Sequence, residues 1–66
     1  MITLSINGKK ETIEETNIDE LLKSKSIDKS EVVVEFNKKI LKRDSLKDTL
    51  LNNDDVLEII RFVGGG

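Results

Sequence analysis

The chain begins with a pattern that predicts a β-hairpin, and this pattern restricts the fold more than any other feature of the sequence. Residues 2, 4 and 6 are apolar and alternate with polar residues, which is typical of a strand with one buried and one solvated face. The dipeptide Asn7-Gly8 favours the positive φ angles of a type I′ turn. We therefore expect the segment from Lys9 to about Glu14 to return as a second strand, which argues against a helical bundle.

A single helix is predicted after this hairpin. Asn17 and Glu20 have the spacing of an N-cap residue and its capping-box partner, so the helix should begin here and continue to about Lys25. The apolar residues of this segment fall at the i, i+3, i+4 spacing of one helical face: Ile18, Leu21 and Leu22. We expect this face to pack on a sheet.

The second half of the chain predicts three more strands and a short helical turn. Val32, Val34 and Phe36 alternate with residues 31, 33 and 35, two of which are glutamates, which predicts a strand. Ile40 and Leu41 could form a short strand, and residues 37–39 should form the turn between them. Leu46, Leu50 and Leu51 have helix-like spacing within residues 44–51, and residues 52–55 favour a turn. Residues 56–63 should form a central strand that is buried on both faces, apart from Glu58 and Arg61.

This order of elements indicates an α+β fold. Because the chain has only 66 residues, it cannot be divided into two parts that each bury a core. Parallel pairing of the first and last strands at the middle of a mixed sheet, with the helix across one face, would give a β-grasp of four to five strands. We expect residues 1–63 to form this domain and residues 64–66 to form a flexible glycine tail.

The residue types that are absent argue against several classes of function. Without histidine or cysteine the chain has no imidazole base, thiolate nucleophile or zinc ligand set, so we expect neither catalysis nor a metal site. A net charge of -2 and only two aromatic residues argue against nucleic acid as a partner. The first residues do not have the pattern of a signal peptide, and no apolar run suits a membrane span, so we expect a cytoplasmic location and no membrane partner.

The last three residues, Gly64, Gly65 and Gly66, directly follow the last predicted strand. Because glycine has no Cβ, such a segment can enter a channel that is too narrow for other residues and present an unhindered carboxylate. A carboxylate becomes a good electrophile when it is joined to AMP, and a sulfur nucleophile can then displace AMP to leave a thiocarboxylate. This role suits a chain without catalytic side chains. The alternative interpretation of the three glycines is a frayed end or a cloning remnant.

Four segments of the chain resemble the ThiS family of thiamine-pathway sulfur carriers, which belongs to the ubiquitin-like β-grasp superfamily. These segments are residues 2–8 (ITLSING), 18–22 (IDELL), 34–41 (VEFNKKIL) and 57–66 (LEIIRFVGGG). The chain departs from the family pattern at Lys42, where proline is common. It also departs at residues 53–55, where the family often has a glycine flanked by acidic residues and this chain has Asn-Asp-Asp.

The resemblance implies a carrier and not an enzyme, with no bound cofactor. Gly66 would be adenylated by an E1-like adenylyltransferase of the ThiF type that uses ATP. It would then be converted to a thiocarboxylate with sulfur from a donor such as a cysteine desulfurase. Thiazole synthase of the ThiG type would take this sulfur. Val63, Gly64 and Gly65 would form the part of the tail that a partner binds.

Two surfaces outside the tail have alternative interpretations. Arg61 and Phe62 could add a partner patch, although an aromatic residue in a strand is more often part of the core. A basic cluster could be a solvated face or could dock an acidic partner; it consists of Lys38, Lys39, Lys42, Arg43 and Lys47.

Three other functions remain open from the sequence. The sulfur carrier of molybdopterin synthesis, which acts as a subunit of its synthase, resembles this fold and ending. A ubiquitin-like protein modifier would instead form isopeptide bonds with lysine side chains through Gly66. A binding domain with an idle tail would use neither chemistry.

Overall fold

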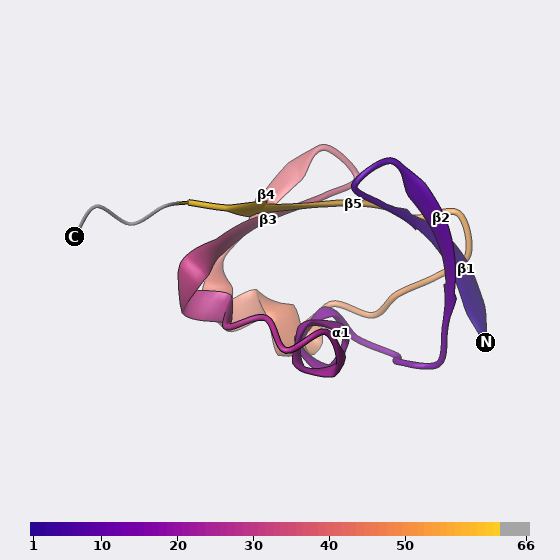
Figure 1. Ribbon diagram of the computed structural model, residues 1–66, viewed down its shortest axis with the longest axis horizontal. Helices are drawn as coiled ribbons and strands as arrows, with labels where there is room; N and C mark the ends of the chain where they lie inside the picture. The colour runs from indigo at the N-terminus through magenta and orange to yellow at the C-terminus, as the bar shows by residue number, and fades with distance from the viewer. Residues whose placement is uncertain (63–66) are drawn as a thin grey trace.

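The computed structural model describes residues 1–62 and has a five-stranded sheet with one α-helix packed beneath it (Figure 1). The strands pair in the order β2-β1-β5-β3-β4 and are β1 (Ile2–Ile6), β2 (Lys9–Ile13), β3 (Val32–Phe36), β4 (Lys39–Leu41) and β5 (Val56–Arg61). β5 pairs parallel with β1 and antiparallel with β3. The predicted α+β fold of the β-grasp type is therefore confirmed, while the predicted domain boundary at residue 63 lies outside the described residues.

Two tight turns set the register of the two hairpins. Asn7 and Gly8 have φ angles of 51° and 83°, and they join Ile6 directly to its partner Lys9. The second turn contains no glycine, and Asn37 and Lys38 adopt its positive φ angles of 50° and 75°. Both turns match the positive φ values that a two-residue β-hairpin requires.

The helix α1 (Ile18–Ser24) begins and ends close to where the sequence predicts. The Asn17 side chain accepts a hydrogen bond from the Glu20 backbone N–H at 2.8 Å, which satisfies one of the free donors of the first turn. The helix is followed by Lys25 as the C-cap and by Ser26 with φ 58°. Its three buried side chains pack against the sheet: Ile18, Leu21 and Leu22.

A short 3₁₀ helix, η2 (Arg43–Asp48), replaces the helical turn that was predicted for residues 44–51. Because η2 ends at Asp48 and Thr49 has an extended backbone, the last two leucines of this segment lie in extended chain and point in different directions. Leu46 and Leu51 are buried, at 2% and 4% exposure, but Leu50 is 66% exposed. The prediction that groups Leu50 with the other two is therefore wrong. A second 3₁₀ helix, η1 (Lys29–Glu31), precedes β3.

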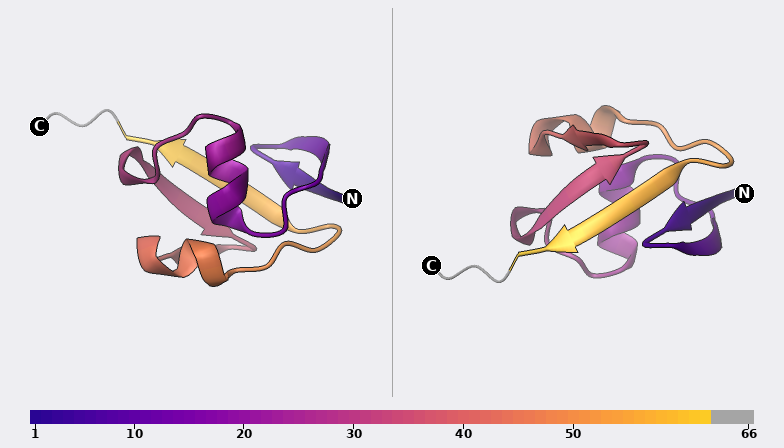
Figure 2. Two further views of the ribbon diagram at one scale, coloured as in Figure 1. Left: turned by 90° about the horizontal axis from the view of Figure 1, so that it is seen from below. Right: turned by 90° about the horizontal axis from the view of Figure 1, so that it is seen from above.

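β5 lies at the centre of the sheet, but it is not buried on both faces. Figure 2 shows α1 across one face of the sheet and the other face uncovered. Leu57, on the covered face, is fully buried, whereas Val56 and Ile60 are 46% and 53% exposed. The prediction of burial on both faces is wrong because an apolar, β-branched run is also compatible with a strand that has one open face.

Candidate functional site

The predicted site begins where β5 ends. β5 runs to Arg61, and the backbone N–H of Phe62 donates a hydrogen bond to the Glu31 carbonyl at 3.2 Å, which continues the pairing along β3 by one residue. The other predicted site residues, Val63, Gly64, Gly65 and Gly66, lie outside the described residues. The structure therefore defines the base from which the tail continues.

Two turn asparagines hold β5 in place with their side chains. The Ile59 N–H donates to Asn7 Oδ1 at 2.7 Å, and Asn7 Nδ2 donates back to the Ile59 carbonyl at 3.3 Å. At the start of the strand, the Val56 N–H donates to Asn37 Oδ1 at 2.8 Å. Each side-chain amide thus makes hydrogen bonds to β5 of the kind that the backbone of a neighbouring strand makes. The sequence marks both asparagines as turn residues but gives no signal of this second role.

Arg61 and Phe62 were predicted to share one patch, but they lie on different surfaces. Consecutive residues of an extended chain point to opposite faces, and these two line different hollows, one with Ile59 and the other with Val33 and Ile40. They therefore do not form one continuous patch, and contact of either residue with a partner stays a prediction. Phe62 is 46% exposed, so the alternative that places it in the core is wrong.

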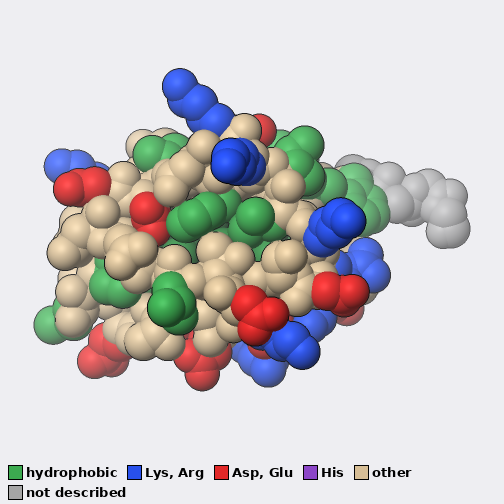
Figure 3. Space-filling model, turned by 180° about the vertical axis from the view of Figure 1, so that it is seen from behind, with side chains coloured by type: hydrophobic (Ala, Val, Ile, Leu, Met, Phe, Trp, Pro, Cys, Tyr) green, Lys and Arg blue, Asp and Glu red, His purple; other side chains and the backbone are tan. Residues whose placement is uncertain are grey.

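An apolar surface lies on the uncovered side of the sheet near the end of β5. We call it the open-face patch, and it consists of Val33, Ile40, Ile60 and Phe62. Val33 and Ile60 are direct cross-strand partners. Figure 3 shows hydrophobic side chains at the surface of the end of the molecule where the described residues stop. A partner that binds the tail can use such a patch.

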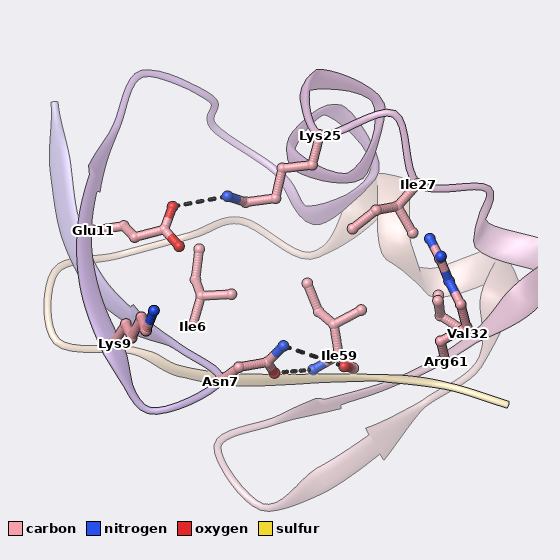
Figure 4. Close-up of a pocket in the computed structure, with 9 residues that line it drawn as sticks. All are labelled: Ile6, Asn7, Lys9, Glu11, Lys25, Ile27, Val32, Ile59 and Arg61. Carbon is pink, nitrogen blue, oxygen red and sulfur yellow. Dashed lines mark hydrogen bonds and ion pairs between the residues drawn. The ribbon is translucent and has the colours of Figure 1, made fainter.

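A second surface lies on the covered side, between the sheet and the end of α1 (Figure 4). We call it the helix-side hollow, and it has a volume of about 460 Å³. Its floor is apolar and is formed by Ile6, Ile27, Val32 and Ile59. Charged side chains surround this floor: Lys9, Glu11, Lys25 and Arg61. Lys25 Nζ lies 2.8 Å from Glu11 Oε1, so these two side chains neutralise each other.

Two carboxyl groups among the described residues have shifted pKa values, and both belong to the scaffold outside this site. A hydrogen bond from Lys23, together with the positive charges of Lys23 and Lys29, lowers the pKa of Asp19. A backbone hydrogen bond from Ser30, with a second bond from its hydroxyl, lowers the pKa of Asp28. Both carboxylates hold local structure near η1, where Asp28 caps that helix.

Within residues 1–62, the remaining charged groups are not arranged as a binding site or a metal site. All five members of the basic cluster are exposed, and none of them forms an ion pair with another described residue. In the same part of the chain no group of three or more His, Cys, Asp or Glu side chains is placed to hold a metal ion. None of the helices described there is long and apolar enough to cross a membrane.

Comparison with known proteins identifies the family. The model of the ThiS family matches residues 4–66, which include the last strand and the glycines after it. The chain belongs to the ThiS family. Its relative in Bacillus subtilis (strain 168), a sulfur carrier protein ThiS, is 38% identical over 65 residues, which cover 96% of this chain and 98% of the relative.

Two further comparisons extend this result. The crystal structure of a thiamine biosynthesis protein, ThiS, from Geobacter metallireducens superposes with a TM-score of 0.83 at 32% identity, covering 98% of this chain and all of the other. A thiazole synthase of Paramagnetospirillum magneticum (strain ATCC 700264 / AMB-1) is 34% identical over 64 residues. This match covers 96% of our chain but only 20% of that protein. A ThiS-family segment therefore occurs as a small part of a longer protein named thiazole synthase.

Proposed function

We propose that this chain is a sulfur carrier for formation of the thiazole ring of thiamine, with the carboxylate of Gly66 as the group that carries sulfur. The observation that carries the proposal is the ThiS-family match, which extends through residue 66 and is accompanied by 38% identity to a sulfur carrier protein. The central position of β5 supports it, because this strand fixes the base of the segment that leads to Gly66.

The proposed chemistry needs no catalytic side chain on the carrier. A carboxylate oxygen of Gly66 attacks the α-phosphorus of ATP in an E1-like adenylyltransferase of the ThiF type, and pyrophosphate leaves. The outer sulfur of a donor persulfide, such as that of a cysteine desulfurase, then attacks the acyl carbon of the adenylate and displaces AMP, which gives an acyl disulfide. A second thiol reduces this S–S bond, so that the donor cysteine leaves as a disulfide with that thiol and a thiocarboxylate remains on Gly66. ATP is a substrate of the partner enzyme and not a cofactor of the carrier.

Thiazole synthase of the ThiG type is the proposed acceptor of the sulfur. The presence of a ThiS-family segment within a longer protein named thiazole synthase supports this choice, because fusion keeps two cooperating domains at a high effective concentration. Because the adenylation consumes ATP, we place the reaction in the cytoplasm. The carrier is thus a co-substrate of two enzymes, and we expect it to bind neither nucleic acid nor a membrane.

Intact-protein mass spectrometry tests this proposal. The chain is incubated with ATP, its cognate adenylyltransferase and a sulfur donor. We expect a mass gain that equals the replacement of one oxygen by one sulfur. The control is a variant that lacks Gly66, which should unfold at the same urea concentration as the wild type and gain no mass. Absence of the gain with an adenylyltransferase that is active on another carrier would refute the proposal, as would a gain on the shortened variant.

A further inference from the structure

We propose that the helix-side hollow is a docking site for thiazole synthase, and that it takes a segment of the enzyme with a carboxylate beside an aliphatic side chain. This inference rests on the proposed function, because it concerns the enzyme that takes sulfur from Gly66. It adds a second contact surface to the tail, on the side of the sheet opposite the open-face patch.

The position of Arg61 places the hollow next to the reacting end of the chain. Arg61 is the last residue of β5 and stands at the edge of the hollow (Figure 4). Gly66 follows Arg61 by five positions in the sequence, and a fully extended chain over five residue steps spans at most about 18 Å. An active site that holds Gly66 must lie within this distance of Arg61. The enzyme surface around that active site therefore faces the end of β5 and is close enough to reach the hollow.

The charges of the hollow favour a carboxylate. Three cationic side chains surround it against one carboxylate, and that carboxylate is already paired, since Glu11 lies 2.8 Å from Lys25. Lys9 and Arg61 remain, and neither has an ion-pair partner among the described residues. Figure 4 shows them toward opposite ends of the hollow, with Ile6 and Ile59 between them. An acidic group that enters there meets positive potential on both sides.

The open face of the sheet, in contrast, disfavours a carboxylate. Glu35 of β3 and Glu58 of β5 are direct cross-strand partners on that face, so two carboxylates already lie side by side there. A further carboxylate would be repelled by this pair. The hollow that Phe62 lines has Lys29 and Arg43 at its edge, but Lys29 is already paired with Asp19. The helix-side hollow, with two unpaired cations among the described residues, is thus the surface at the end of β5 that better fits an acidic segment.

The floor of the hollow explains the aliphatic part of the proposed ligand. Ile27 and Ile59 are only partly buried, so each still presents apolar surface to water at the bottom of the hollow. An aliphatic side chain that covers them removes this surface from water, while the carboxylate beside it stays near the cationic edge. A free metabolite would need a more complete set of fixed polar partners than the hollow offers.

A matched pair of double variants tests the proposal. Lys9→Glu with Arg61→Glu reverses the two unpaired charges of the hollow. The control variant, Lys10→Glu with Arg43→Glu, makes the same change in net charge away from the hollow. Lys10 follows Lys9 on the other face of β2, and Arg43 lies beside β4. Urea unfolding shows that each variant is folded. Isothermal titration calorimetry with purified thiazole synthase then gives Kd, and mass spectrometry gives the rate of thiocarboxylate formation.

We expect the hollow variant to bind thiazole synthase about ten-fold more weakly or worse, and the control variant to stay within about three-fold of the wild type. Thiocarboxylate formation should proceed normally in all three chains. Equal Kd values for the two variants would overturn the inference. Loss of thiocarboxylate formation in the hollow variant alone would assign the surface to the adenylyltransferase and would also overturn it. Failure of the proposed function has a different signature, because the wild type itself would then form no thiocarboxylate.

Discussion

Replacement of Leu51 by alanine should destabilise the domain far more than the same replacement at Leu50. The two residues are neighbours with identical side chains, but Leu51 is 4% exposed and Leu50 is 66% exposed. Truncation of a buried leucine costs about 2 to 5 kcal/mol, because transfer energy is lost and the cavity closes only in part. We expect about 3 kcal/mol at Leu51. At the surface position the cost should stay below about 0.5 kcal/mol.

This difference is large compared with the total stability. A domain of 66 residues without disulfide or metal has a free energy of unfolding on the order of 5 kcal/mol. The Leu51→Ala variant should therefore keep about 2 kcal/mol. With a urea m-value of about 1 kcal/mol/M, its unfolding midpoint should fall by about 3 M at constant m.

Far-ultraviolet circular dichroism is the appropriate assay, because the chain has neither tryptophan nor tyrosine to report by fluorescence. The result that would refute the reasoning is an equal fall in midpoint for the two variants. That outcome is what the sequence pattern alone predicts, since it places Leu46, Leu50 and Leu51 on one helical face.

Two further predictions concern the scaffold. The variant Asn7→Gly loses the side-chain hydrogen bonds to Ile59, while glycine still adopts the positive φ of the turn. Its free energy of unfolding, measured in urea, should fall by about 1 to 3 kcal/mol. A change below about 0.3 kcal/mol would show that these bonds do not stabilise the fold. Lowered pKa values of Asp19 and Asp28 in the folded state contribute stability above the carboxyl pKa of the unfolded chain. This contribution is lost as pH falls through the folded-state values, so the urea midpoint should be level above about pH 5 and fall below about pH 4. Replacement of both residues by asparagine should reduce that fall, and an unchanged pH profile would contradict the assignment.

Much of the fold is predictable because its signals are local. The hairpin turn at Asn7 and Gly8, the N-cap at Asn17 and the apolar face of α1 each depend on a few neighbouring residues, and each lies where the sequence places it. The pairing of β1 with β5 was correctly inferred from the order of the elements.

The errors concern which side chains are buried, and that depends on where an element ends and on what packs over it. Val56, Ile60 and Phe62 are apolar like core residues, but none of the elements within residues 1–62 packs over the open face of the sheet. Leu50 is exposed because η2 ends at Asp48. In the candidate site, the proposed role of Gly66 came from the family resemblance. The helix-side hollow combines residues from β1, β2, the segment after α1, β3 and β5, so no single segment could reveal it.

The position of β5 also has a consequence for folding kinetics. The β1-β2 and β3-β4 hairpins are local and can form early, but they are neighbours of β5 and not of each other. Pairing Ser5 with Val56 closes a loop of roughly 50 residues, at an entropic cost of about 3.5 kcal/mol before other terms. We therefore expect the docking of β5 to be the late step of folding. Under the proposed function, a partly folded chain would leave the segment that leads to Gly66 without its support. Only molecules that have completed folding would then offer both the tail and the surfaces beside it to an enzyme.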